Sequence, residues 1–257
     1  MPDAIFAHPR LAEVYDAFDR PRDDLAAYLA IAEELGAQRV LDVGCGTGCL
    51  AIALAAAGRA VTGADPAAAS LEVARAKDGG AAVSWIQADA TSLPPVGPDL
   101  AGTDLAGTDL AGTDLAVMTG NVAQVFLSDQ EWAQVLQAIA AALRPGGYLV
   151  FETRRPARRA WQDWAAEPGP VTLDVPGHGL VEQRFELTAV DLPLVSFRYT
   201  YTFLADGTVI ASDSTLRFRS REELEISLSA AGYQVLDVRE APDRPGREFV
   251  FIAQRTA

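Results

Sequence analysis

The stretch "VLDVGCGTG", residues 40–48, decides the fold of this chain. Its apolar start, interrupted by Asp42 alone, predicts a buried strand, and glycines at 44, 46 and 48 predict a tight turn into the helix that follows. Bare glycine backbone lets a ligand approach such a turn, and the free N–H groups of the helix start point toward that ligand. The stretch therefore predicts a ligand-binding strand–turn–helix unit.

The glycine spacing separates two ligand classes. A dinucleotide-binding turn follows G-x-G-x-x-G and places a pyrophosphate on the start of the helix. Counted from Gly44, the third glycine of that motif would fall on Cys49, whereas this chain has Gly48 instead. The spacing disfavours an NAD(P)-dependent oxidoreductase, which stays as an alternative.

Acidic residues end three successive predicted strands. Asp42 suits a ligand with a cationic amino group and would repel a phosphate. Asp65, in "AVTGADP" (60–66), stands where an acid accepts hydrogen bonds from ribose hydroxyls, and Asp89, in "AVSWIQAD" (82–89), is placed for an adenine amino group. An amino acid tail, a ribose and an adenine occur together in S-adenosylmethionine. Simpler roles are open: Asp42 can orient the loop, and Asp65 can cap the next helix.

Strands alternate with helices along the rest of the chain. Helices are predicted over 21–35, over 128–143 behind a capping box, and after a second capping box at 220–223; further strands are predicted at 114–121, 148–152, 233–238 and 248–254. This alternation predicts an α/β fold, a doubly wound Rossmann-like sheet of seven mostly parallel strands.

An antiparallel β insertion is predicted after the fifth strand. "VSFRYTYTF" (195–203) alternates apolar and polar residues, and Asp206-Gly207 predicts a two-residue hairpin. The expected organisation is an N-terminal helical cap (1–36), a Rossmann-like domain (37–152 and 220–257) and a β lid (153–219).

A tandem repeat precedes the fourth strand: "DLAGT" occurs three times over 99–113. Ligands bind at the carboxyl ends of parallel strands, so an insertion before a strand lies on the opposite rim. We expect a surface loop without a catalytic role. The alternative is one coil of a pentapeptide-repeat β-helix, which would lack neighbours to stack on.

The chain resembles class I S-adenosylmethionine-dependent methyltransferases from Val40 to Glu152 and over the last two strands. The matching pieces are "VLDVGCGTG", "VTGADP", "WIQADATSLP", "DLAVMTGN" and "LRPGGYLVFE". The resemblance implies cofactor contacts at the amino acid portion (Asp42, Gly44, Gly46), the ribose (Asp65), the adenine (Asp89, Ala90) and the sulfonium (Thr119 or Asn121), completed by Cys45, Gly48, Pro66 and a covering Tyr15. The β insertion resembles that of sugar-amine N,N-dimethyltransferases, where it helps cover the active site.

The expected activity is methyl transfer to an O or N atom of a small molecule, mainly by alignment and exclusion of water. Two residues are candidate bases: His178 in "VPGHGLV" and Glu152 at the end of the fifth strand. A solvent-exposed loop position is the simpler role for His178, and a solvated hinge is the simpler role for the arginine-rich run 154–161. A protein of the same fold that binds S-adenosylmethionine without methyl transfer is the second alternative.

Composition limits the partners. In this 257-residue chain a net charge of −14 repels phosphate backbones and anionic membranes, so we expect neither as a partner. With two cysteines and two histidines we expect no metal and no disulfide framework, and a reducing compartment. The N-terminus has no signal-peptide pattern and no segment is apolar over a membrane-spanning length, so the predicted location is cytoplasmic, with a homodimer left open.

Overall fold

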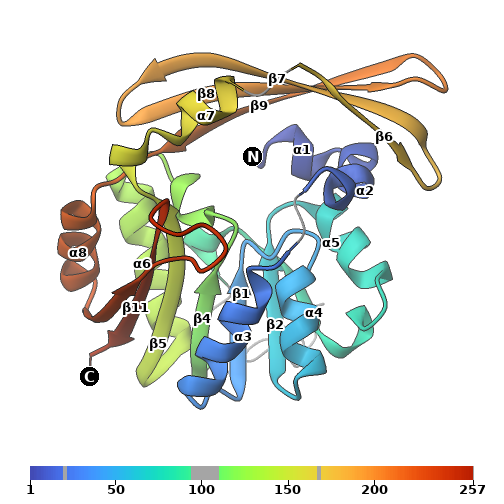
Figure 1. Ribbon diagram of the computed structural model, residues 1–257. Helices are drawn as coiled ribbons and strands as arrows, with labels where there is room; N and C mark the ends of the chain where they lie inside the picture. Colours follow the sequence, from blue (N-terminus) through green and yellow to red (C-terminus); the bar gives the residue numbers. More distant parts are fainter. Residues whose placement is uncertain (20–21, 94–109, 167–168, 257) are drawn as a thin grey trace.

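The computed structural model describes residues 1–19, 22–93, 110–166 and 169–256. It contains two β-sheets stacked one above the other, with helices on both faces of the lower one (Figure 1). The repeat 99–113 lies outside the described residues up to position 109. Its last residues carry the buried Leu110 and Thr113, and the chain enters the fourth strand there.

The lower sheet, sheet A, has the strand order β10-β11-β5-β4-β1-β2-β3. β11 runs antiparallel to both of its neighbours, and the other paired strands are parallel, which confirms the predicted seven-stranded mostly parallel sheet. The strands are β1 (Arg39–Val43), β2 (Ala60–Asp65), β3 (Ser84–Gln87), β4 (Thr113–Met118), β5 (Leu143–Arg154), β10 (Tyr233–Arg239) and β11 (Glu248–Arg255).

β5 is longer than the predicted 148–152. It gains length at its start because Leu143 pairs with Thr113, and at its end because Arg154 pairs with Glu248 of β11. A turn lies inside these bounds, where Gly146 has φ 74°. The extension at the end matters for the site, because it holds Arg154 and Glu248 side by side.

Helices cover both faces of sheet A. Alternate strand residues point to opposite sides, so Leu41 packs with α6 (Asp129–Ala142) and α8 (Arg221–Ala230), whereas Val40 packs with α3 (Leu25–Glu34) and α4 (Cys49–Ala56). α5 (Ala68–Ala76) lies beside β2 and β3. Both predicted capping boxes are present, at the starts of α6 and α8. α3 is shorter than the predicted 21–35.

The upper sheet, sheet B, is the predicted antiparallel insertion, and we call it the lid. It consists of β6 (Val171–Val175), β7 (Gly179–Asp191), β8 (Leu194–Phe203) and β9 (Thr208–Arg217). The hairpin at Asp206-Gly207 has a four-residue loop, not the predicted two, because Phe203 pairs with Thr208. A helix that the sequence did not indicate, α7 (Ala160–Ala165), precedes the lid.

The N-terminal helices α1 (Ala4–Ala7) and α2 (Pro9–Phe18) lie between the lid and sheet A (Figure 1). Leu11 and Val14 pack against Tyr201 and Phe203 of the lid. On the other side, Ser70 Oγ of α5 donates to the backbone oxygen of Phe6 at 2.9 Å. The lid is thereby held over the carboxyl ends of the parallel strands, the edge where such sheets bind ligands. No described helix has the length and apolarity needed to cross a membrane.

Candidate functional site

The glycine turn between β1 and α4 lies at this edge. Gly44, Gly46 and Gly48 all have positive φ, at 71°, 52° and 81°. A Cβ on Gly44 would come within 2.7 Å of the Val122 side chain, and one on Gly48 within 2.5 Å of Trp85. Glycine is therefore needed for both backbone conformation and space, and the turn leaves bare backbone toward the pocket.

Asp65 at the end of β2 holds the turn in place. Its Oδ2 accepts a hydrogen bond from Gly46 N and its Oδ1 one from Ala67 N, both at 2.8 Å. The side chain is 7% exposed, and burial raises its pKa. The helix-start role considered for Asp65 is present in this geometry, because Ala67 is the residue before α5. Each carboxylate oxygen keeps a second lone pair for a ligand hydroxyl.

Asp42 lies beneath the turn and is 2% exposed. Burial raises its pKa from 3.8 to about 7; nearby Arg22 acts in the opposite direction, and nearby Asp65 adds to the rise. A carboxylate that is costly to ionise in the empty pocket favours a cation beside it. The amino group that the sequence assigned to this position meets that requirement.

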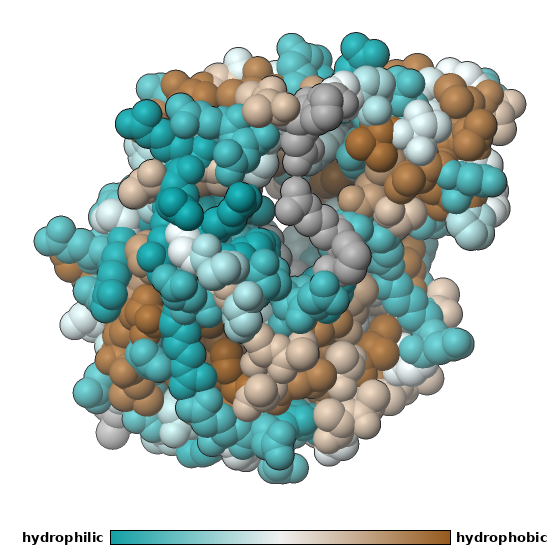
Figure 2. Space-filling view, viewed as in Figure 1, coloured by the Kyte–Doolittle hydropathy of each residue, from teal (hydrophilic) through white to brown (hydrophobic). Residues whose placement is uncertain are grey.

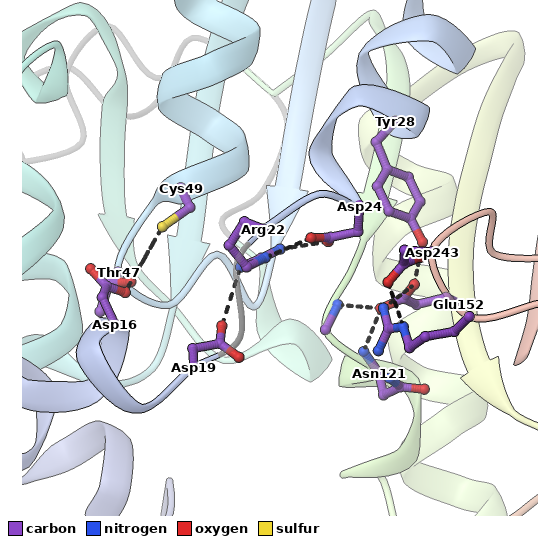
Figure 3. A network of polar contacts seen from close by, with 12 residues as sticks. Asp16, Asp19, Arg22, Asp24, Tyr28, Thr47, Cys49, Asn121, Glu152 and Asp243 are labelled. Carbon is purple, nitrogen blue, oxygen red and sulfur yellow. Dashed lines mark hydrogen bonds and ion pairs between the residues drawn. The ribbon is translucent and has the colours of Figure 1, made fainter. Parts of the chain in front are cut away.

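Arg22 is the site residue that sequence reasoning missed. It precedes α3 and matches no motif, so no local signal marks it. Its Nε and Nη2 donate to Asp24 at 2.9 Å each, and its Nη1 lies 3.8 Å from Asp19 (Figure 3). The positive charge of Arg22 lowers the pKa of Asp42, against the effect of burial. A zwitterionic amino acid group would offer an anion to Arg22 and a cation to Asp42.

The first prediction concerns pH and Asp42. Because burial raises the pKa of Asp42 from 3.8 to about 7, the neutral carboxyl group favours the folded protein without ligand. This contribution to stability is complete below about pH 4 and is lost as the pH rises through about 7. A cationic ligand group needs the ionised form, so affinity for S-adenosylhomocysteine should fall by up to about tenfold per pH unit below about 7. Calorimetric titration between about pH 5 and pH 8 measures this dependence of the affinity on pH. Asp42→Asn is the control and should bind weakly at every pH; equal pH dependence in both proteins contradicts the assignment.

α2 contacts the glycine turn from above. Asp16 Oδ1 accepts a hydrogen bond from Thr47 Oγ1 at 2.6 Å, and its Oδ2 pairs with Lys77 Nζ at 2.5 Å. One helical position earlier, Tyr15 is half-buried with its ring 5.4 Å from that of Phe6, and burial raises its pKa well above the ordinary value. The structure therefore brings Tyr15 to the helix that borders the turn, and its cofactor contact stays a prediction.

The end of β3 contributes the predicted adenine side of the pocket. Asp89 is exposed, and its Oδ1 accepts from Thr91 N at 2.8 Å and from Thr91 Oγ1 at 2.7 Å. Ala90 is 8% exposed, and the backbone oxygen of Pro66 accepts from Gln87 Nε2 at 3.2 Å. Cys45 is half-buried in the turn, and burial raises the pKa of its thiol well above the ordinary value, as expected of a packing residue.

The end of β4 is fixed by Glu152. Thr119 and Asn121 are buried, and Asn121 has the unusual φ of 63°. Glu152 Oε1 accepts from Gly120 N at 2.7 Å and from Asn121 N at 3.2 Å, while Oε2 accepts from Tyr28 and lies 3.5 Å from Arg244 Nη2 (Figure 3). The carboxylate is fully buried with protein donors on both oxygens. This geometry favours an anchoring role, and proton transfer by Glu152 stays a prediction.

His178 lies in the turn between β6 and β7 of the lid, whereas Glu152 lies on β5 of sheet A. Its Nε2 is 3.0 Å from Glu13 Oε2 of α2, and its ring centroid is 5.7 Å from that of Phe203. The structure therefore places the two predicted bases on different sheets, with different partners. Catalysis by His178 also stays a prediction. Within the described ranges, no three His, Cys, Asp or Glu side chains gather as a metal site.

The arginine-rich run 154–161, which begins at the last residue of β5, was expected to be a solvated hinge, and the structure agrees for only part of it. Arg158 and Arg159 are exposed, whereas Arg154 and Arg155 are half-buried. Arg155 Nη2 donates to Glu240 at 3.0 Å, and the Arg154 guanidinium lies 5.0 Å from the centroid of the Trp164 ring. The reason is the pairing of the end of β5 with β11, which places Arg154 beside Glu248 and lets Arg155 Nε donate to the backbone oxygen of Glu248 at 3.0 Å.

A glycine turn, acids at the ends of three parallel strands and a covering antiparallel sheet define a class I S-adenosylmethionine-dependent methyltransferase fold. Comparison with known families agrees: residues 40–147, less than half of the chain, match the model of the methyltransferase domain. This match covers the glycine turn and the strands β1 to β4, where the predicted cofactor contacts lie.

Among curated proteins, the chain is similar to two ubiquinone biosynthesis O-methyltransferases. It is 34% identical over 132 residues to that of Pectobacterium carotovorum subsp. carotovorum, over 51% of this chain and 48% of the relative. It is also 34% identical over 124 residues to that of Serratia proteamaculans, over 48% of this chain and 45% of the relative. The chain thus spans about half the length of the curated relatives it matches.

Solved structures match nearly the whole chain. The CcbJ methyltransferase of Streptomyces caelestis has a TM-score of 0.73 at 21% identity, covering 96% of both chains. The sugar N-methyltransferase KedS8 of a Streptoalloteichus species has a TM-score of 0.72 at 21% identity, covering 95% of this chain and 94% of its own. At these identities the match concerns the fold, lid included.

Proposed function

We propose that the protein binds S-adenosylmethionine at the edge of sheet A beneath the lid. Asp42 holds the amino group and Arg22 the carboxylate of the methionine portion. Asp65 accepts hydrogen bonds from the ribose hydroxyls, and Asp89 with Ala90 contacts the adenine. The supporting observation is the buried Asp42 under a glycine turn, because the amino group of the methionine portion can neutralise that carboxylate and a dinucleotide offers no such cation.

We further propose that the reaction is methyl transfer to an O or N atom of a small molecule in the cytoplasm. The activated methyl group carries its own driving force, so the chain has to align the acceptor and exclude water. The lid and α2 suit that task because they cover the ligand edge. O-methyltransferases among the sequence relatives and sugar N-methyltransferases among the fold relatives support a small acceptor.

A thermal-shift comparison tests the proposed cofactor. S-adenosylmethionine and its demethylated product should raise the unfolding temperature, because a ligand that binds only the folded state stabilises it by about 2.7 kcal/mol at a hundredfold excess over its dissociation constant. NADH should leave it unchanged. Stabilisation by NADH alone would favour the oxidoreductase alternative and end this proposal. A protein that binds S-adenosylmethionine but labels no metabolite when incubated with methyl-labelled cofactor and an extract of the source cell would be a binding protein, not a transferase.

A further inference from the structure

Two buried acceptor atoms at the ligand edge lack donors. Asn121 Oδ1 and Glu248 Oε2 belong to side chains that are each 2% exposed, and neither accepts a hydrogen bond from the described residues. The other polar atom of each side chain has a partner, since Asn121 Nδ2 donates to Glu248 Oε1 at 3.1 Å and Arg244 Nη1 lies 3.0 Å from the same oxygen. An unfilled buried acceptor costs about 1–3 kcal/mol, so a pair of them in one place indicates a missing donor.

A cation that is not closely neutralised lies beside them. Arg154 Nη1 donates to the neutral Gln124 Oε1 at 3.0 Å. Among the described residues, the one carboxylate within 4.0 Å of its nitrogens is Glu248, at 3.9 Å from Nε, which is too long for a hydrogen bond. Burial lowers the pKa of Arg154 despite that carboxylate, as expected of a guanidinium that is desolvated without a close partner. The group of Arg154, Asn121 and Glu248 therefore combines a cation that has no close anionic partner with two acceptor oxygens that have no donor.

These three residues lie next to the predicted position of the methyl group and beneath the aromatic face of the lid. Asn121 follows β4 in the segment assigned to the sulfonium, and its backbone is fixed by Glu152. The Trp164 ring lies 5.0 Å from the Arg154 guanidinium and 5.7 Å from the Phe197 ring of the lid. Figure 2 shows the molecular surface hollowed between lid and sheet A. With 22% of its side chain exposed, Arg154 is the accessible member of the group.

We propose that Arg154, Asn121 and Glu248 form the subsite for the methyl-accepting group, and that this group is a hydroxyl on a ring-bearing small molecule. A hydroxyl donates one hydrogen bond, to Glu248 Oε2 or Asn121 Oδ1, and accepts another from Arg154. An aliphatic amine is protonated at neutral pH, so it has no lone pair for Arg154 and is repelled by that guanidinium, whereas a hydroxyl is neutral at the same pH. The aromatic side chains of α7 and the lid supply an apolar surface for the ring. This inference rests on the proposed methyl transfer and specifies its acceptor.

The chemical step follows from these contacts. The hydroxyl oxygen forms a bond to the methyl carbon with one of its lone pairs, while the bond between that carbon and the sulfonium breaks and its electron pair stays on sulfur. The hydroxyl proton passes to Glu248, which becomes neutral, and the guanidinium of Arg154 stabilises the negative charge that develops on the oxygen. Burial raises the pKa of Glu248, and nearby Glu152 adds to the rise, so this carboxylate takes up a proton more readily than an exposed one. Glu248 is then a catalytic residue.

Probe binding tests the subsite without knowledge of the natural acceptor. Fluorine NMR follows para-fluorophenol, para-fluorobenzylamine and fluorobenzene on the full-length protein saturated with S-adenosylhomocysteine. Para-fluorophenol should bind most tightly, and Glu248→Gln and Arg154→Met should each weaken it about tenfold or more, since hydrogen bonds to charged groups are worth about 1.5–3 kcal/mol. Fluorobenzene binding should not change. Glu186→Gln on the outer face of the lid and Arg158→Met on the exposed part of the arginine run are the matched controls.

The outcomes separate the two proposals. Unchanged affinity of all variants for S-adenosylhomocysteine, with loss of para-fluorophenol alone, supports the subsite; Arg154→Lys serves as a second variant if Arg154→Met does not fold. Preference for para-fluorobenzylamine, equal binding of para-fluorophenol and fluorobenzene, or no binding of para-fluorophenol overturns the hydroxyl subsite while leaving cofactor binding intact. If the wild-type protein binds neither S-adenosylmethionine nor S-adenosylhomocysteine, the proposed function is overturned instead. In the extract experiment, an N-methylated product would overturn the hydroxyl subsite. A methyl ether whose formation is slowed about a hundredfold or more by Glu248→Gln would support that subsite.

Discussion

Asp65→Ala is expected to raise the dissociation constant for S-adenosylmethionine by about two orders of magnitude or more. The proposed contacts are two ribose hydroxyls donating to a buried carboxylate, and hydrogen bonds to charged groups contribute about 1.5–3 kcal/mol each. The substitution also frees the amide of Gly46, which Asp65 Oδ2 holds at 2.8 Å, so the glycine turn loses its anchor to β2. Isothermal titration with the purified variant measures the change.

The fold should survive this substitution. Two amides without acceptors cost about 1–3 kcal/mol each, whereas domains of ordinary stability unfold at about 5–15 kcal/mol. Circular dichroism and urea denaturation check this point. Asp78→Ala is the matched control, because Asp78 is exposed beyond the end of α5 and should leave the affinity within twofold of wild type, about the scatter of surface substitutions. A wild-type affinity in Asp65→Ala would remove Asp65 from the site.

Glu152→Ala is expected to lower the free energy of unfolding by about 3–5 kcal/mol, the range for breaking one side of a buried ion pair. Its carboxylate is fully buried and receives the backbone amides of Gly120 and Asn121, the Tyr28 hydroxyl and the charge of Arg244. Burial raises the pKa of Tyr28 well above its ordinary value, so that hydroxyl stays a donor at neutral pH. Urea denaturation of both proteins measures the loss.

Glu152→Gln separates anchoring from proton transfer. The amide keeps an acceptor for the backbone of the segment after β4, so an anchoring Glu152 predicts a smaller stability loss and a largely retained turnover. A base at this position predicts retained stability with turnover lowered by about a hundredfold or more. For Glu152→Ala, a loss under about 1 kcal/mol, the size measured for exposed ion pairs, would contradict the anchoring role itself.

Much of the fold was predictable because its signals are local. Glycines at 44, 46 and 48, the alternation in 195–203 and both capping boxes report on neighbouring residues, and the structure confirms the elements they predict. Element lengths were less predictable. β5 is longer than predicted because its ends are set by pairing with Thr113 and Glu248, which lie far away in the sequence.

The candidate site also contains residues that the sequence predicted and residues that only the structure revealed. Asp42 and Asp65 were predictable because each ends a strand of a parallel sheet, and that position alone brings them to one edge. Arg22 was not, because it approaches Asp42 only when α3 packs on sheet A. Glu248 was not predictable either, because no sequence motif marks an acid at the start of β11. Its neighbours Asn121 and Arg154 come from the segment after β4 and from the end of β5.

The sequence by itself determined the class of fold and the chemical parts of the cofactor, and it indicated the edge of the sheet at which we propose that the cofactor binds. These depend on strand order and on backbone freedom at glycine, both of which short-range patterns encode. The tertiary structure alone decided which carboxylates are saturated, as Glu152 is, and which keep an open oxygen, as Glu248 does. Burial and hydrogen-bond satisfaction are properties of the packed chain, because each donor comes from a different element.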